Sequence, residues 1–324
     1  MRSHAPLEEF KTAVKGVLAF PITPYGKDGN VDLEAVARNA RWFPETGVAA
    51  VVAPSGTGEL PSLAPEECVA VTTAMVEAME GRLPVIAGVG FGARVAAELA
   101  RRAEEAGAAG LMVMPPYYQA PSPNGLVEYC SWIADRTELP LIAYVRDSAV
   151  FTPESLVRLV REVPTVVGFK EGRADIRLFQ RLRSQIGQQV EPGRLVWLAG
   201  AGDDVVGPFL AAGAEGFTSS LAAFWPEPAV RMFELAASGD YPAIDQLQER
   251  VVRPIYELRQ RRPGFEVAVM KSAMEMLGYV AGPVRPPLEN LRQADREDLR
   301  AVLAALDVPK AGDRDRAMLN ASAT

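Results

Sequence analysis

The sequence of 324 residues has few of the residue types that build common metal and nucleophilic centres. It contains one histidine, His4, and two cysteines, Cys68 and Cys130. A single histidine in a polar N-terminal segment argues against a His-ligated zinc site and against a Ser-His-Asp triad. Two distant cysteines provide neither a disulfide framework nor a Cys-x-x-Cys motif, so we expect both to be buried structural thiols.

Long apolar runs and an excess of positive charge are also missing. No apolar run reaches the ~18 residues of a membrane span, and residues 1–9 lack the apolar core of a signal peptide. Thirty-four Lys and Arg against 41 Asp and Glu give a net charge of −7, which argues against nucleic-acid binding through bulk charge. We therefore expect a cytoplasmic protein without nucleic-acid or membrane partners. An anionic substrate would then need local positive charge or aimed backbone N–H groups.

The residues that are plentiful predict a regular α/β fold. Hydrophobic residues make up 48% of the chain, and short apolar runs alternate with helical patterns. Eight of these runs are rich in Val, Ile, Leu and Ala without strict polar alternation, as strands buried on both faces are. They are Gly16–Ile22, Val48–Pro54, Pro84–Val89, Ala109–Met114, Pro140–Tyr144, Thr165–Lys170, Arg194–Ala199 and Ala214–Ser219. Helices are expected between them, for example at Asp32–Phe43, Pro65–Met79, Arg94–Ala106 and Pro153–Arg161, the last with Thr152 as N-cap.

Eight strand–helix units at a spacing of roughly 25–30 residues predict a (β/α)8 TIM barrel. An open, doubly wound sheet is the alternative. The expected organisation is an N-terminal segment at 1–15, the barrel at 16–237, a C-terminal helical segment at 238–308 and a poorly ordered tail at 309–324. Within the helical segment, we expect helices at Tyr241–Arg261, Glu266–Leu277 and Leu288–Leu306.

In such a barrel, catalytic residues lie at the carboxyl ends of the strands. Lys170 ends the apolar run 165–169, and a lysine among apolar neighbours has a lowered pKa and a neutral amine that attacks carbonyl groups. The alternative is a lysine beyond the strand that reaches solvent or pairs with Glu171. Tyr144 ends the preceding strand, where its phenol would shuttle protons beside Lys170 or simply pack.

Two other strand ends carry polar residues. The turn at 55–59 (Ser-Gly-Thr-Gly-Glu) offers hydroxyl and N–H groups to a carboxylate or phosphate. A plain tight turn is the alternative, and the turn lacks the Gly-Lys-Ser/Thr ending of a P-loop. Asp203 and Asp204 follow the seventh strand, where helix capping is favoured over metal binding.

Taken together, these motifs resemble one enzyme superfamily. The motifs are 20–24 (Phe-Pro-Ile-Thr-Pro), 56–59 (Gly-Thr-Gly-Glu), 116–118 (Pro-Tyr-Tyr), Tyr144 and 168–171 (Gly-Phe-Lys-Glu). In this order and spacing, the chain is similar to the dihydrodipicolinate synthase and N-acetylneuraminate lyase superfamily of class I Schiff-base aldolases and lyases, over roughly residues 10–305. The resemblance implies a barrel with C-terminal helices and a homo-oligomer, a tetramer or dimer. It also implies an imine between a lysine and a 2-oxo acid, which needs no metal or organic cofactor.

The resemblance also assigns roles to individual residues. It implies that Lys170 forms the imine and that Tyr144 relays protons. Ser55, Gly56 and Thr57 would form the turn for the carboxylate of the 2-oxo acid, with Thr57 helping to bind it. Tyr118 would correspond to the tyrosine that, in many members, reaches into a neighbouring subunit.

Within the superfamily, the chain most resembles the 5-dehydro-4-deoxyglucarate dehydratases. These share the Ser-Gly-Thr-Gly-Glu turn, with glycine at position 56 where many other members have threonine, and a strand-five end like Tyr144 to Asp147. Val145 stands where asparagine is usual. The implied reaction dehydrates and decarboxylates a six-carbon 2-oxo dicarboxylate, giving 2,5-dioxopentanoate, water and carbon dioxide. A pyruvate-dependent aldolase or synthase of the same superfamily and a non-catalytic sugar-acid sensor are the alternatives.

A substrate with two negative charges needs matching groups. Arg146 has the planar guanidinium that suits a carboxylate, although it could equally pair with Asp147. Ser219 and Ser220, at the end of the eighth strand, are candidates for the distal hydroxyls or carboxylate.

Overall fold

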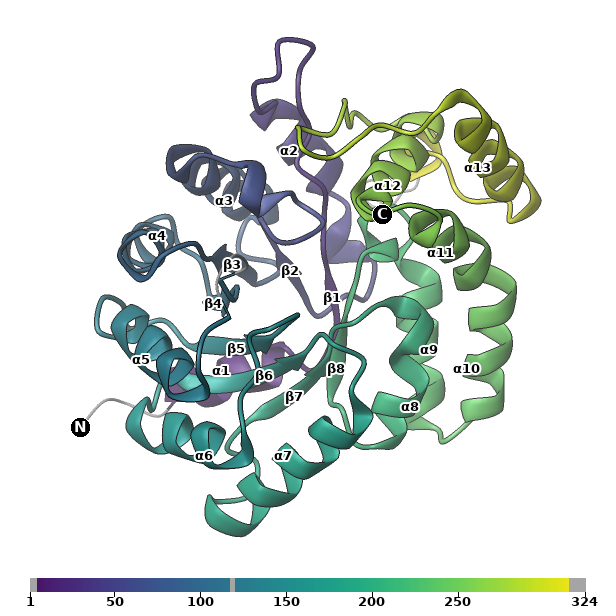
Figure 1. Cartoon of the computed structure of the whole chain (residues 1–324). Coiled ribbons are helices and arrows are strands. Elements are labelled where there is room, and N and C mark those ends of the chain that lie inside the picture. The colour runs from purple at the N-terminus through teal and green to yellow at the C-terminus, as the bar shows by residue number, and fades with distance from the viewer. Residues whose placement is uncertain (1–4, 117–119, 315–324) are drawn as a thin grey trace.

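The computed structural model describes residues 5–116 and 120–314, and its eight strands close into one barrel (Figure 1). Neighbouring strands are parallel and pair in chain order, and β8 returns to β1. The strands are β1 Gly16–Ala19, β2 Ala50–Val52, β3 Val85–Val89, β4 Gly110–Val113, β5 Leu141–Val145, β6 Val166–Glu171, β7 Val196–Ala199 and β8 Gly216–Ser219. The closed barrel confirms the TIM-barrel prediction over the open sheet.

Each predicted apolar run coincides with one strand, but most strands are shorter than the runs. The first run was expected to reach Ile22, whereas β1 ends at Ala19. Pro21 follows two residues later and has no N–H to donate to a neighbouring strand. The fifth and sixth strands differ in the other direction, because β5 continues past Tyr144 to Val145 and β6 past Lys170 to Glu171.

Helices surround the barrel (Figure 1). The α-helices are α2 Leu33–Ala40, α3 Pro65–Met79, α4 Ala93–Glu105, α5 Pro123–Ala134, α6 Pro153–Glu162, α7 Ile176–Gln189, α8 Val206–Ala211 and α9 Pro226–Ala237. Short 3-10 helices are η1 Phe43–Glu45, η2 Leu60–Ser62, η3 Asp203–Val205 and η4 Leu221–Ala223. Thr152 is the N-cap of α6, as predicted, because its side chain accepts a hydrogen bond from the Ser155 N–H at 3.2 Å. Within the described residues, no helix has the length and apolarity needed to cross a membrane.

The N-terminal segment contains a helix that the sequence analysis did not predict. Helix α1, Ala5–Ala13, brings Phe10 to the barrel, and Val14 follows directly after it. Both side chains pack with Leu18, Ile86 and other residues of the inner barrel layer. Phe10 leaves no room for a side chain at Gly110, where a Cβ would lie 2.4 Å from its ring. The segment therefore forms part of the core.

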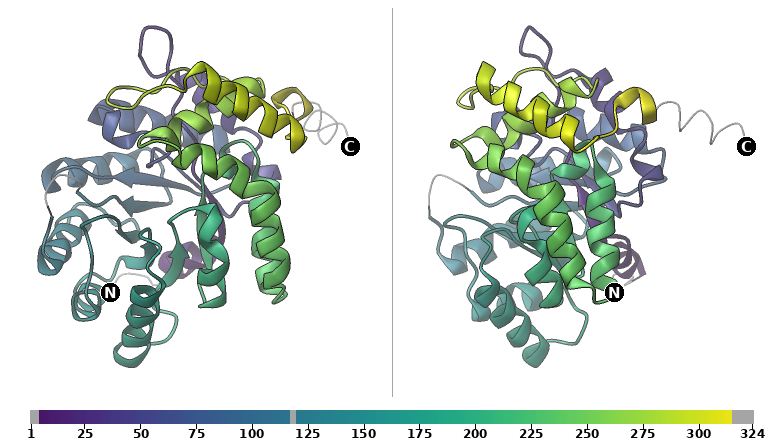
Figure 2. Two further views of the ribbon diagram at one scale, coloured as in Figure 1. Left: turned by 45° about the vertical axis from the view of Figure 1, so that its right-hand side comes forward. Right: turned by 90° about the vertical axis from the view of Figure 1, so that its right-hand side faces the viewer.

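After the barrel, the chain is helical. The C-terminal helices are α10 Tyr241–Leu247, α11 Arg253–Gln260, α12 Phe265–Met276 and α13 Gln293–Ala305, with a π-helical turn, η5 Gln248–Val252, between α10 and α11. The single helix expected at 241–261 is thus continuous but contains a π turn. The last helix begins at Gln293 rather than at Leu288. Figure 2 shows α13 at the opposite end of the barrel from α1.

The expected tail begins in contact with the folded chain. Within the described part, Arg314 forms an ion pair with Glu227 at 2.7 Å and lies over the Trp42 ring, 4.3 Å from its centroid. Arg314 thus contacts the folded chain.

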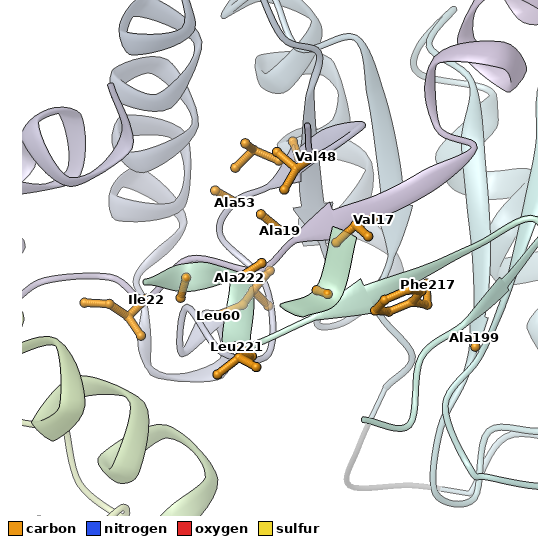
Figure 3. Packing of buried hydrophobic residues seen from close by; sticks show 14 of the residues in the cluster. Val17, Ala19, Ile22, Val48, Ala53, Leu60, Ala199, Phe217, Leu221 and Ala222 are labelled. Atoms are coloured by element: carbon orange, nitrogen blue, oxygen red, sulfur yellow. The ribbon is translucent and has the colours of Figure 1, made fainter. Parts of the chain in front are cut away.

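One hydrophobic core joins the barrel strands to the surrounding helices. Figure 3 shows part of it, where Val17 and Ala19 of β1 lie near Phe217 of β8. The same core extends into the C-terminal helices, for example to Leu299 of α13. Cys68 and Cys130 are buried free thiols, as predicted.

A buried ion pair fastens the loop after β2 to helix α12. The Nζ of Lys271 lies 2.6 Å from Oε1 of Glu59, and both side chains are almost fully buried. The other oxygen, Oε2 of Glu59, accepts a hydrogen bond from the Arg285 N–H at 2.9 Å. Burial lowers the pKa of Lys271 to about 8, against the opposing effect of Glu59. The turn at 55–59 is thereby tied to the C-terminal helices.

This ion pair predicts a large asymmetry between single and double variants. Removal of one buried partner leaves an uncompensated charge, so we expect Lys271→Met to lower the free energy of unfolding by about 3–5 kcal/mol. Urea denaturation measures this. The double variant Glu59→Gln/Lys271→Met should recover part of the loss. As control, Lys15→Met breaks the exposed pair with Glu215 and should cost less than about 1 kcal/mol. Equal losses in the free energy of unfolding for Lys271→Met and Lys15→Met would contradict this account.

Candidate active site

A cavity of ≈ 440 Å³ opens at the carboxyl ends of the strands. Its walls come from strand ends and the loops after them, and residues of α11 and α12 complete the rim. Lys170, Tyr144, Arg146, Gly56, Thr57 and Ser220, all expected from the sequence, line this one cavity. The structure thus gathers residues from β2, β5, β6 and β8 in the place where TIM barrels carry out chemistry.

Lys170 lies inside the barrel mouth, not in solvent. Only 2% of the residue is exposed. It pairs with Tyr144 in the β5–β6 register, and its Nζ lies 3.5 Å from the centroid of the Tyr144 ring. Glu171 is buried as well, but strand alternation places it on the other face, where Oε1 accepts the Arg173 N–H. The alternative of a solvated or Glu171-paired lysine is therefore excluded.

Burial and neighbouring charges shift the pKa values of Lys170 and Tyr144. Loss of water lowers the pKa of the Lys170 amine below its ordinary value, and the opposing effect of Tyr144 does not cancel this. Burial works to raise the pKa of the Tyr144 phenol, but the positive charges of Lys170 and Arg146 together outweigh it and lower this pKa. Both pKa values are thus lowered from those of an isolated lysine and tyrosine.

Two glycines leave the room that this pair occupies. A Cβ on Gly200, just after β7, would lie 2.2 Å from Cε of Lys170. A Cβ on Gly172, just after β6, would lie 2.3 Å from Cε2 of Tyr144. Any larger residue at either position would displace a reacting side chain.

The turn after β2 presents Gly56 and Thr57 to the cavity. The Thr57 and Ser220 hydroxyls lie 2.9 Å apart, so the turn meets the end of β8. The turn is anchored because the Thr23 hydroxyl donates to the Gly58 carbonyl at 2.6 Å. Ser55 is fully buried and does not line the cavity, which corrects the expectation that it faces the substrate.

The end of β8 presents alternate residues. Thr218 and Ser220 line the cavity, whereas the fully buried Ser219 does not. The Ser219 hydroxyl instead accepts the Ala222 N–H at 2.9 Å. Successive side chains on a strand face opposite sides, so only one of the two expected serines is available to substrate.

Arg146 lies at the cavity and contacts Asp147, the alternative partner expected from the sequence. It lines the cavity, and its Nε lies 3.4 Å from Oδ1 of Asp147 with 47% of the side chain exposed. The remaining candidate, Tyr118, lies outside the described residues.

The sequence analysis missed Thr218 and Arg259 as cavity residues. Arg259 belongs to α11, beyond the barrel, and no local motif marks it. A signal was present, because Arg259 follows Val252 and Ile255 at helical spacing and so falls on the apolar face of its helix.

Asp203 corrects the capping interpretation. Its Oδ2 accepts the N–H groups of Ser220 and Leu221, at the start of η4 rather than of its own turn. Among residues 5–116 and 120–314, no three His, Cys, Asp or Glu side chains gather where they could hold a metal ion.

Known proteins share both the sequence and the fold. Residues 13–306 match the model of the dihydrodipicolinate synthetase family. A probable 5-dehydro-4-deoxyglucarate dehydratase 1 of Streptomyces coelicolor is 40% identical over 88% of this chain and 90% of its own. A probable 5-dehydro-4-deoxyglucarate dehydratase of Bradyrhizobium diazoefficiens is 33% identical over 94% and 96%. The crystal structure of dihydrodipicolinate synthase from Bacillus clausii superposes with a TM-score of 0.85 at 29% identity, over 92% of this chain and 99% of its own.

The family match begins before β1 and ends after α13, so it spans the whole barrel and the C-terminal helices. Two relatives above 30% identity cover most of the chain as well. The chain belongs to the dihydrodipicolinate synthetase family.

Proposed function

We propose that this enzyme is a decarboxylating hydro-lyase that converts 5-dehydro-4-deoxyglucarate into 2,5-dioxopentanoate, water and carbon dioxide. The observation that carries the proposal is the buried Lys170 amine against the Tyr144 ring, in a cavity of ≈ 440 Å³. The names of the relatives from Streptomyces and Bradyrhizobium support the choice of substrate.

The chemistry begins at Lys170. Its neutral amine attacks the ketone, water leaves, and a protonated imine forms. A proton is then lost from the adjacent methylene, and the resulting enamine expels the β-hydroxyl as water. The unsaturated imine next accepts the electron pair of the bond to the distal carboxylate, which leaves as carbon dioxide. Protonation and hydrolysis return the Lys170 amine and release the product.

Tyr144 is the proposed proton carrier for these steps. Its ring lies against the Lys170 amine, so its hydroxyl is near the carbon that loses a proton and the oxygen that leaves. A phenol with a lowered pKa accepts and returns a proton more readily than an ordinary tyrosine. The N–H groups and hydroxyl of the Gly56–Thr57 turn would hold the carboxylate beside the imine.

We also propose that the enzyme is a cytoplasmic homo-oligomer, a dimer or tetramer, that works without a metal or organic cofactor. These proposals rest on family membership and on the imine chemistry, in which the protonated imine is the electron sink. Its partner is a small 2-oxo dicarboxylate.

The first test is product analysis. With 5-dehydro-4-deoxyglucarate, we expect stoichiometric carbon dioxide and 2,5-dioxopentanoate without pyruvate. Lys170→Met should abolish turnover, and borohydride should then no longer attach a 2-oxo acid to the protein. Pyruvate release would instead identify an aldolase. An unlabelled Lys170 in the wild type would identify a sensor, and either result would overturn the proposal.

The second test is the pH dependence of Tyr144→Phe. Loss of the general acid–base should lower kcat by about 10²–10⁴-fold. Tyr144 raises the pKa of Lys170, so its removal lowers that pKa further. The pH at which imine trapping declines on acidification should therefore move down. A shift to higher pH would contradict the proposed coupling.

The third test concerns Gly200. Gly200→Ala places a Cβ 2.2 Å from the present position of Lys170 Cε, so the amine must move. Misplacement by about 1 Å costs on the order of 10²-fold, and we expect that loss in kcat/KM. Gly187→Ala in α7 is the control, because its Cβ meets nothing within 4 Å. Wild-type activity in Gly200→Ala would show that the glycine does not position the amine.

A further inference from the structure

Arg259 brings a buried positive charge into the cavity from outside the barrel. It lies on α11, only 9% of it is exposed, and it lines the cavity. Its Nη1 is buried without a hydrogen-bond partner. Within the part of the chain that the structure describes, no carboxylate lies within ion-pair distance of it. A buried guanidinium nitrogen without a hydrogen-bond partner lowers the stability of the fold. A ligand that accepts a hydrogen bond from it would offset this loss.

The rest of the guanidinium is held in place. Its Nε donates to the Glu266 carbonyl at 3.2 Å, and its Cζ lies 4.2 Å above the centre of the Tyr256 ring. Its Nη2 donates to the Ser220 hydroxyl at 3.4 Å. Three contacts thus fix the plane of the guanidinium at the wall of the cavity.

One buried carboxylate organises both sides of this arrangement. Oδ2 of Asp203 accepts the Ser220 N–H at 3.2 Å and also the Tyr256 hydroxyl. Asp203 therefore fixes the backbone that carries the serine and the ring that supports Arg259. Contacts that hold the binding groups in place in this way are what a preorganised site requires.

We propose that Arg259 and the Ser220 hydroxyl form the subsite that binds the distal carboxylate of the substrate. The assignment deepens the proposed function and rests on it for the identity of the substrate. Arg259 is a specificity-determining residue, because it favours 2-oxo acids with a second carboxylate over those without one. Guanidinium and carboxylate are matched in geometry and charge.

The order of contacts indicates that Arg259 binds the distal carboxylate rather than the carboxylate beside the imine. Thr57, Ser220 and Arg259 form a row joined by contacts of 2.9 and 3.4 Å. In the proposed mechanism, Thr57 holds the carboxylate next to the reacting carbon. Arg259 stands at the other end of the row, where the far end of an extended dicarboxylate would lie.

Arg146, the arginine expected from the sequence, is the weaker candidate for this role. It lies 3.4 Å from Asp147, and nearly half of its side chain is exposed. Its charge is thus partly neutralised and screened by water. Arg259 has no carboxylate within ion-pair distance among the described residues, and only 9% of it is exposed. Asp203 attracts it from further away, but the Asp203 carboxylate already accepts hydrogen bonds from Ser220 and Tyr256. Arg259 therefore gains more from an incoming carboxylate than Arg146 does.

The experiment compares two probes that differ only at the far end. One is 2-oxohexanedioate, with a second carboxylate, and the other is 2-oxohexanoate, with a methyl group there. Borohydride trapping on Lys170, followed by mass spectrometry, gives the half-saturating concentration of each. The variants are Arg259→Gln, Arg259→Lys, Arg146→Gln and, as control, Arg253→Gln. Arg253 lies on the same helix, exposed and paired with Glu249.

We expect Arg259→Gln to raise the half-saturating concentration of 2-oxohexanedioate by about 10- to 100-fold, the value of a charged hydrogen bond, and to affect 2-oxohexanoate far less. Arg259→Lys should retain part of the preference, because it keeps the charge but not the planar group. Arg253→Gln should match the wild type, and Arg146→Gln should lose less discrimination than Arg259→Gln.

Three results would overturn the assignment. They are equal weakening of both probes in Arg259→Gln, no weakening of either, and a greater loss of discrimination in Arg146→Gln. Trapping of 2-oxohexanoate reports that the variant is folded. The assay needs only imine formation, so it separates the two proposals. A discriminating Arg259 in an enzyme that releases no carbon dioxide would leave the subsite standing and overturn the proposed reaction.

Discussion

The removal of water from one amine is the constraint on which the site depends. Lys170 lies within β6 with 2% of its surface exposed, and the charged form of a lysine loses its hydration there. The neighbouring carboxylate does not restore the charge, since Glu171 lies on the opposite face of the strand and binds the Arg173 N–H. Gly200 and Gly172 keep the space in which Lys170 and Tyr144 meet. A lysine and a phenol that both have lowered pKa values follow from this packing.

Much of the barrel was predictable from the sequence because strands buried on both faces leave a simple pattern. Lys170 stood out for the same reason, as a charge at the end of an apolar run. The directions in which individual polar side chains point were harder to predict. Ser55 and Ser219 have the right chemistry but do not line the cavity. Their orientation depends on where each strand ends, and the Ser219 hydroxyl accepts the N–H of Ala222 in η4. Helix α1 escaped prediction because its apolar residues are few and gain their partners only from the closed barrel.

The C-terminal helices contribute to the site as well as to stability. Lys271 of α12 holds Glu59 and hence the turn that presents Thr57. Arg259 of α11 reaches the same cavity from the other side. Neither contact was predictable from the sequence, because each joins residues that are distant along the chain and that share no motif. Such long-range pairs become visible only when the fold brings the elements together.

The central claim is that the pKa of Lys170 is lowered. The chain has six lysines, so a carbon-detected NMR titration of ε-¹³C-lysine protein can follow each one, with the Lys170 signal identified by its loss in Lys170→Met. Burial lowers the pKa of Lys170, so we predict that Lys170 titrates below the ordinary lysine value of about 10.4. A Lys170 that titrates at or above that value would contradict the central claim.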